Sequence, residues 1–219
     1  MKNVIGILFL LVCAYSGRCQ ILNPVLNDAF LVPRGGFEAT VGYSALGISA
    51  ESESEVIFNS LDFQLGYGLT RKISLVARYE KSWFAKQMFE ETASNFLFIG
   101  PEFMLKENRI SLSVPLGTRF IKDVDESYFE ITPTLNTSLP LGSKVFLNPA
   151  VKLGFVFCEE CPDSPFVGVN LGIGVRPTEL ISFFAEYGLT YATEDFGEGH
   201  FYAINGGLAF RFLRKNNPE

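Results

Sequence analysis

Hydrophobic and polar residues alternate with a period of two along most of this chain, and short turns interrupt the alternation. In the stretch LGYGLTRKISLVARY, Leu65, Tyr67 and Leu69 alternate with small residues, and the alternation restarts at Ile73 after a turn. A period of two is that of a β-strand, so this stretch predicts a strand, a tight turn and a second strand. The pattern alone does not say which face meets water. Soluble barrels bury their apolar face inside, whereas membrane barrels turn it outward.

Similar turns recur at intervals of roughly 35 residues, and no helical pattern separates them. The predicted two-residue turns lie at residues 70–71, 107–108, 142–143 and 177–178. Each unit consists of a strand, a longer loop and a returning strand. The first strand is expected to start near Gly35 and the last to end at Phe212, which gives five units. The sequence therefore predicts an all-β, antiparallel up-and-down barrel of ten strands.

Four prolines fall inside these predicted strands, where proline is disfavoured. They are Pro101, Pro115, Pro133 and Pro149. Each lacks a backbone N–H and removes one donor from the ladder of hydrogen bonds between strands. We expect β-bulges at these positions. The alternative is that one hairpin is misplaced and the barrel has eight strands.

The composition decides which face of the strands points outward. Each predicted strand carries about four or five mostly large apolar residues on one face, too many for the interior of a barrel with so few strands. Those residues must face outward, where lipid covers them. The chain is 47% hydrophobic and 19% charged. It has no apolar run of 18 or more residues after its N-terminus, which argues against a bundle of membrane helices.

The opposite face of the strands is small or polar and is predicted to line a lumen. Acidic and basic residues on this face are nearly matched in number. The predicted lumen charge network consists of Asp62, Arg78, Glu80, Glu102, Arg119, Lys152 and Glu186. One interpretation is a structural plug of salt bridges, because an unpaired charge in a desolvated lumen costs several kcal/mol. The other is a narrow ion or solute path that these pairs gate, in which case neutralising Lys152 or Glu102 should alter conductance.

The N-terminus has the features of a signal for export. Lys2 precedes an apolar run from Val4 to Val12, and small residues follow. We expect residues 1–19 to be a signal peptide, 20–34 a periplasmic segment, 35–212 the transmembrane barrel and 213–219 a periplasmic tail. Short turns of such barrels face the periplasm and long loops face outward. The predicted location is therefore a bacterial outer membrane with both termini in the periplasm.

Removal of the signal leaves two cysteines, Cys158 and Cys161, in a predicted outer loop. Because an exported chain meets an oxidising compartment, we expect a disulfide between them. Free thiols, redox chemistry and zinc binding are the alternatives for this C-x-x-C spacing. Zinc would need two more ligands, and the chain has a single histidine, His200. No cofactor or metal site is expected, and a net charge of −6 argues against a nucleic-acid partner.

The predicted outer loops carry three further features. Acidic residues dominate them, so the rim could bridge divalent ions to lipopolysaccharide phosphates or simply keep the loops solvated. An aromatic and sulfur-containing group in the second loop could dock a partner or anchor a strand end in the membrane interface. This group consists of Trp83, Phe84, Met88 and Phe89. Asp195 or Glu198 could also act with His200 as an acid–base pair, although a lone histidine in an acidic loop is usually only a loop residue.

The hairpins LGYGLTRKISLVARY and AEYGLTYATEDFGEGHFYAINGGLAFRF resemble those of small outer-membrane β-barrel proteins of the Bacteroidetes type. The resemblance covers the predicted mature chain and rests on pattern rather than on invariant motifs. It implies the fold and the outer-membrane location. It implies no single activity, because such barrels act as pores, enzymes, adhesins and parts of secretion machines.

The expected function is that of a non-enzymatic structural or partner-binding component of the envelope, such as a part of a secretion or assembly complex. Its expected partners are outer-membrane lipid, lipopolysaccharide and envelope proteins. The alternatives are a narrow channel for ions or small solutes and a rim hydrolase with the architecture of the omptins. The motif of those proteases cannot be matched residue by residue here.

Overall fold

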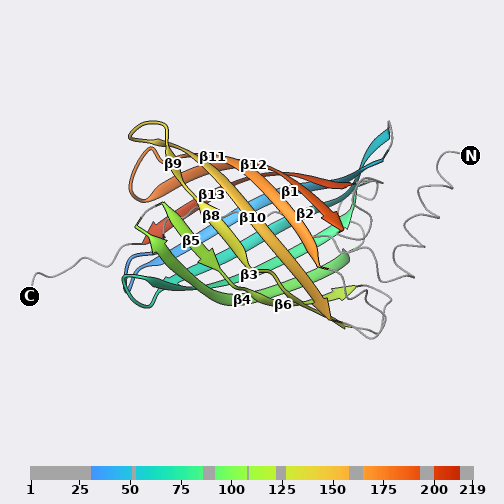
Figure 1. Cartoon of the computed structure of the whole chain (residues 1–219), viewed down its shortest axis with the longest axis horizontal. Coiled ribbons are helices and arrows are strands. Elements are labelled where there is room, and N and C mark those ends of the chain that lie inside the picture. The colour runs from blue at the N-terminus through green and yellow to red at the C-terminus, as the bar shows by residue number, and fades with distance from the viewer. Residues whose placement is uncertain are drawn as a thin grey trace, which may run out of the picture.

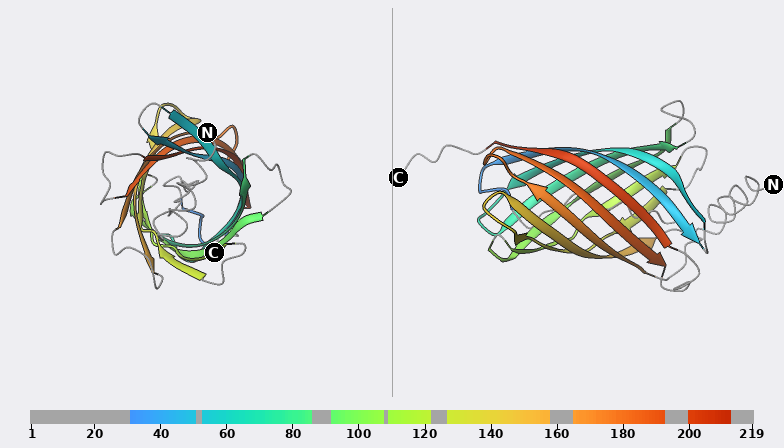
Figure 2. Two further views of the ribbon diagram at one scale, coloured as in Figure 1. Left: turned by 90° about the vertical axis from the view of Figure 1, so that its right-hand side faces the viewer. Right: turned by 90° about the horizontal axis from the view of Figure 1, so that it is seen from above.

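The structure is a computed structural model that describes residues 31–50, 53–85, 92–107, 109–121, 127–157, 165–192 and 200–212. These residues form one closed antiparallel barrel of ten strands, as predicted (Figures 1 and 2). Strand β1 pairs with β13 from Phe37 opposite Phe212 to Ser49 opposite His200, and this pairing closes the wall. Closure leaves no strand edge unpaired, which a bilayer requires. Within the described residues, no helix is long and apolar enough to cross a membrane.

The ten wall strands comprise thirteen labelled segments, because two of the strands are interrupted. Eight strands are continuous: β1 (Phe37–Ala50), β2 (Glu53–Gly68), β3 (Ile73–Phe84), β4 (Thr92–Lys106), β10 (Val145–Phe157), β11 (Phe166–Val175), β12 (Ile181–Ala192) and β13 (His200–Phe212). The fifth strand is divided into β5 (Ile110–Ser113) and β6 (Leu116–Ile121). The sixth is divided into β7 (Ser127–Ile131), β8 (Thr134–Thr137) and β9 (Leu139–Pro140).

Prolines account for two of these interruptions, but they do not cause the expected bulges. Pro115 separates β5 from β6, yet Ile99 pairs with Leu116 and Glu102 with Ser113, so the register is the same on both sides. The register also continues across Pro133, and Pro101 and Pro149 lie inside paired strands. Register irregularities occur elsewhere, at residues 46–47, 82–83 and 104–106. The prediction of bulges at the four prolines is therefore wrong.

The ladder continues because three of these prolines still offer their carbonyls as acceptors. The Val114 amide donates to the Pro101 carbonyl at 3.0 Å, the Thr132 amide to that of Pro115 at 3.1 Å and the Leu153 amide to that of Pro133 at 3.0 Å. Proline fixes φ at a value that extended backbone can adopt, so only the missing donor opens the ladder.

The apolar face of the strands points outward, which settles the question that the alternation left open. Burial alternates residue by residue along β11, where Leu171 is 54% exposed and its neighbours Asn170 and Gly172 are buried. Large hydrophobic side chains are exposed in the same way on nearly every strand. A continuous apolar surface of this kind is unstable in water and is the lipid-facing band of a transmembrane barrel.

A charged residue placed in this band should destabilise the barrel. We expect Leu171→Arg to lower the free energy of unfolding by about 2–4 kcal/mol in lipid vesicles, because position 171 lies mid-strand among lipid chains. Leu180→Arg is the matched control, since Leu180 is 52% exposed but lies at a turn, where the cost is about 0–1 kcal/mol. Urea unfolding of both variants measures the difference. Equal costs at the two positions would contradict a lipid-facing band at Leu171.

The first described residues, 31–36, lie at the end of the barrel that carries the short turns. Gly35 has a φ of 73°, and its amide donates to the Gly68 carbonyl at 2.7 Å. This turn places Leu31 and Val32 inside the mouth, with exposed fractions of 7% and 4%. The Ser74 hydroxyl donates to the Val32 carbonyl at 3.4 Å.

The structure bears on only part of the predicted domain boundaries. The first wall strand begins at Phe37 and the last ends at Phe212, and the domain boundaries themselves stay predictions. The proposed signal peptide, residues 20–30 and the C-terminal tail lie outside the described residues, so their boundaries stay predictions.

Candidate functional site

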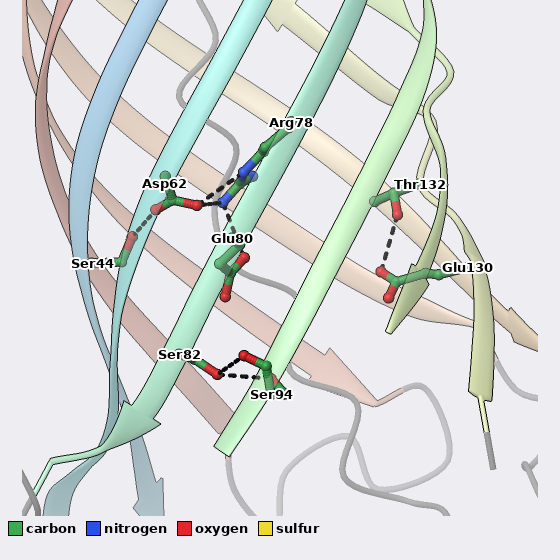
Figure 3. Close-up of polar contacts among 8 residues, drawn as sticks. All are labelled: Ser44, Asp62, Arg78, Glu80, Ser82, Ser94, Glu130 and Thr132. Carbon is green, nitrogen blue, oxygen red and sulfur yellow. Dashed lines mark hydrogen bonds and ion pairs between the residues drawn. The ribbon is translucent and has the colours of Figure 1, made fainter. Parts of the chain in front are cut away.

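The centre of the candidate site is an ion cluster on the inner wall, contributed by β2 and β3. Asp62 and Glu80 are direct partners in the antiparallel register, and Arg78 is the partner of Gln64. Side chains two residues apart in a strand point to the same face, so all three residues face the lumen. Figure 3 shows that the Arg78 guanidinium lies between the two carboxylates.

The contacts of Arg78 hold the cluster together. Its Nε donates to Asp62 Oδ1 at 3.0 Å, and its Nη2 contacts the same oxygen. Nη2 also donates to Glu80 Oε2 at 3.3 Å, and the Ser44 hydroxyl donates to Asp62 Oδ2 at 2.8 Å. The three ionic residues are almost inaccessible to water, with exposed fractions of 1% for Asp62, 4% for Arg78 and 2% for Glu80. Arg78 thus contacts two directly opposed carboxylates away from solvent.

Three other predicted charges also lie on the inner wall. Lys152, which is 2% exposed, lies across Gly168, where an added Cβ would be 2.3 Å from the lysine Cε. Glu186 covers Gly172 in the same manner. The Arg119 guanidinium carbon lies 4.3 Å from the centre of the Phe96 ring, a cation–π contact.

Glu102 lies nearer the short turns than the ion cluster does. It is the register partner of Ser74 on one side and of Ser113 on the other. Its Oε1 accepts a hydrogen bond from the Ser111 hydroxyl at 2.6 Å. The structure therefore places all seven predicted residues on the lumen wall, and Asp62, Arg78 and Glu80 form the salt bridges of the ion cluster.

Two buried charges of the described residues, Glu130 and Arg211, lie outside the predicted network, and Arg211 pairs with Glu38. Glu130 on β7 is 5% exposed, and its carboxylate accepts a hydrogen bond from the Thr132 hydroxyl at 3.1 Å. Its position on the polar face of the strand, beside Thr132, was the available signal. The break at Pro133 shortens the alternation there and weakens that signal.

Glycines on the inner wall accept large neighbouring side chains. An added Cβ at Gly117 would be 2.3 Å from the Phe98 ring, and one at Gly207 would be 2.5 Å from the Phe184 ring. These rings therefore lie along the wall, over the glycines. The small residues on the lumen face thus leave the space that large inward-pointing side chains occupy.

The predicted loop sites are only partly described. Trp83 is 2% exposed, with its ring 6.2 Å from that of Tyr43, whereas Phe84 is 39% exposed and its ring lies 5.0 Å from that of Phe58. Both residues belong to the end of β3. Met88, Phe89 and the predicted disulfide cysteines Cys158 and Cys161 lie outside the described residues.

The histidine of the proposed acid–base pair begins β13. His200 is the register partner of Ser49, and its ring lies 5.4 Å from that of Tyr191. Asp195 and Glu198 lie outside the described residues, so the hydrolase hypothesis stays a prediction. Among the residues that the structure describes, no three His, Cys, Asp or Glu side chains are grouped to hold a metal ion.

No protein-family model and no curated relative matches the sequence. Solved structures of similar fold include the COG4313 outer membrane channel from Pseudomonas putida F1. It has a TM-score of 0.54 and 12% identity, with coverage of 88% of this chain and 100% of that one. The outer membrane protease OmpT from Escherichia coli has a TM-score of 0.45 and 10% identity, with coverage of 81% and 97%. The attachment invasion locus protein Ail of Yersinia pestis has a TM-score of 0.38 and 12% identity, with coverage of 82% and 99%. At 12% identity and a TM-score of 0.54, the similarity to the channel from Pseudomonas putida F1 shows the fold, that of outer-membrane β-barrels. The resemblance to the Bacteroidetes type stays a prediction.

Proposed function

We propose that this chain is a non-conducting barrel of the outer membrane that serves as a structural or partner-binding component of the envelope. The observation that carries the proposal is the burial of charges in the lumen. Asp62, Glu80 and Lys152 are each at most 2% exposed. Charged side chains that line a water-filled channel are solvated by that channel, so nearly inaccessible charges indicate a filled lumen.

The geometry of the ion cluster supports closure. An ion crosses a pore only when each site along the path binds it weakly enough for release. Here Arg78 already satisfies both carboxylates, and Ser44 fixes the second oxygen of Asp62. A passing ion would have to break a desolvated pair, which costs several kcal/mol.

A second closure lies at the end with the short turns. Leu31 and Val32 are buried against the inner wall there, next to Gly66 and Ser74. Apolar side chains at a mouth oppose the entry of hydrated ions. The barrel is thus closed at two levels, one ionic and one apolar.

The proposed partner would bind at the end of the barrel opposite the short turns. Phe84 and Phe58 form an aromatic pair there, and Phe84 is 39% exposed. Aromatic residues are enriched at protein interfaces, where they fill pockets of the partner. Such a pair could dock an envelope protein, for example a component of a secretion or assembly complex.

A narrow channel is the second candidate function. Charges of both signs on the lumen wall favour it, and the similar fold from Pseudomonas putida F1 is described as an outer membrane channel. In that case the lumen charges would select ions, and Lys152→Gln should change the ratio of cation to anion permeability.

Single-channel recording in a planar bilayer tests the proposal. We expect the refolded protein, residues 20–219, to give no steady conductance steps. A variant that lacks both closures, Asp62→Ser/Arg78→Ser/Glu80→Ser/Gly68→Ala, should conduct more than the wild-type protein. It has no ion cluster, and a Cβ at position 68 would be 2.1 Å from the Pro33 carbonyl oxygen and would displace residues 31–33 from the mouth. Conductance of this variant would also serve as a positive control, because it shows that inserted barrels can be detected. Steady, voltage-tolerant steps from the wild-type protein would contradict the proposal and favour the channel.

A further inference from the structure

We propose that the end of the barrel with the short turns binds the phosphate groups of anionic phospholipids in the adjacent leaflet. The proposal rests on a ring of exposed cations and on the exposed leucines beside them. It concerns the outer surface of the barrel and is independent of whether the lumen conducts.

The cations come from three of the four short turns and from the segment that precedes β1. We call the following residues the basic turn ring: Arg34, Arg71, Lys72, Lys106, Arg109 and Lys144. All six are exposed. Among the described residues of the same turns, only Glu107 and Glu179 are exposed carboxylates. Glu38, also at this end, is paired with Arg211, so a clear excess of positive charge remains at the rim.

Each of the four short turns also exposes a leucine. These are Leu69 at 47%, Leu105 at 60%, Leu141 at 63% and Leu180 at 52%. Three of the four lie within three residues of members of the basic turn ring. At the fourth turn the cation is Arg176, which is half-buried, donates to the Ser182 hydroxyl and lies over the Phe146 ring.

The combination of leucine and cation favours a lipid over an acidic protein in solution. A leucine at the edge of the apolar band can contact acyl chains while the neighbouring lysine or arginine extends to the headgroup level. Clusters of such cations attract anionic lipids, and the attraction falls off within a Debye length. The turns lie together at one end of the barrel, the left-hand end in Figure 1, so their cations face a single leaflet.

Spin-labelled lipids provide the test, since electron spin resonance separates lipids in contact with the barrel from bulk lipid. In vesicles of phosphatidylcholine at an ionic strength on the order of 0.01 M, we expect spin-labelled phosphatidylglycerol to associate about threefold more strongly than spin-labelled phosphatidylcholine. At about 1 M salt, where the Debye length is about 3 Å, the preference should fall toward one.

Two variants and a control assign the effect to the basic turn ring. Arg71→Gln/Lys72→Gln should reduce the low-salt preference, and Glu107→Gln/Glu179→Gln should increase it, because the two changes alter the ring charge in opposite directions. Lys81→Gln is the control, since Lys81 is an exposed cation farther along β3, away from the short turns. Each variant changes exposed residues only, so folding should be retained.

Equal association of the two lipids with the wild-type barrel at low salt would overturn the proposal, and an acidic protein would then be the better partner for the ring. A preference that Lys81→Gln reduces as much as Arg71→Gln/Lys72→Gln does would also overturn it. In that case net charge, rather than the ring, would attract the lipid.

Discussion

Replacement of Arg78 by methionine is expected to lower the free energy of unfolding by about 3–5 kcal/mol, because it removes the cation that contacts two buried carboxylates. Asp62 and Glu80 are directly opposite one another on β2 and β3. Like charges in such positions repel, and neither side chain is more than 2% exposed. Methionine retains the volume and flexibility of the arginine stem, so the loss is mainly electrostatic. Equilibrium unfolding in urea, with the barrel in lipid vesicles, measures it.

Two further variants separate the charge effect from a packing effect. The triple variant Asp62→Asn/Arg78→Met/Glu80→Gln removes all three charges and should recover most of the lost stability, since replacing a whole buried ion cluster is often nearly neutral. Arg109→Met removes an exposed arginine from a turn and should change stability by less than about 0.5 kcal/mol. If Arg78→Met and Arg109→Met were equally stable, the ion cluster would not stabilise the barrel.

The sequence predicts the wall of this protein better than its interior. Alternation at positions such as Leu171 and Gly172 assigns each side chain to one face, and short turns set the strand count, so the ten-stranded barrel follows from local pattern. The contact between Arg78 and Asp62 does not follow in that way. It depends on the register between β2 and β3, which places Arg78 opposite Gln64 and diagonal to Asp62.

The prolines show the same limit of local reasoning. Pro115 predicts a missing donor, which is correct, but whether the strand bulges or continues depends on its neighbours. Glycine at position 100 allows the strand pairing to continue past Pro115, because the backbone of Val114 and Pro115 passes close to it. An added Cβ at Gly100 would be 2.4 Å from the Val114 carbonyl oxygen. No periodicity in the sequence indicates such an approach.

Residues 31–33 were the feature of the interior that no pattern indicated. They carry no alternation and lie before the first strand, so the sequence predicts only that they belong to a periplasmic segment. In the structure Leu31 and Val32 are buried in the mouth of the barrel, held by the turn at Gly35 and by the close approach of Gly68.

Gly68→Ala is expected to displace this segment from the mouth. An added Cβ at Gly68 would be 2.1 Å from the Pro33 carbonyl oxygen and 2.4 Å from that of Val32, and both atoms belong to the backbone, which cannot move aside by rotating a side chain. A cysteine introduced as Val32→Cys, in a Cys158→Ser/Cys161→Ser background, reports the displacement. Its rate of reaction with a water-soluble thiol reagent should rise on the order of a hundredfold, which corresponds to roughly 3 kcal/mol of local stability.

Gly142→Ala is the matched control, because the same methyl group at another short turn would meet no atom within 4 Å. It should leave the labelling rate of Val32→Cys unchanged. Conductance of Gly68→Ala should stay absent as well, since the ion cluster around Arg78 lies deeper in the lumen and is not disturbed by a displaced mouth segment. Equal labelling rates in the two alanine variants would show that contact with Gly68 does not hold the segment. Steady conductance steps from Gly68→Ala would show that residues 31–33, rather than the ion cluster, close this barrel.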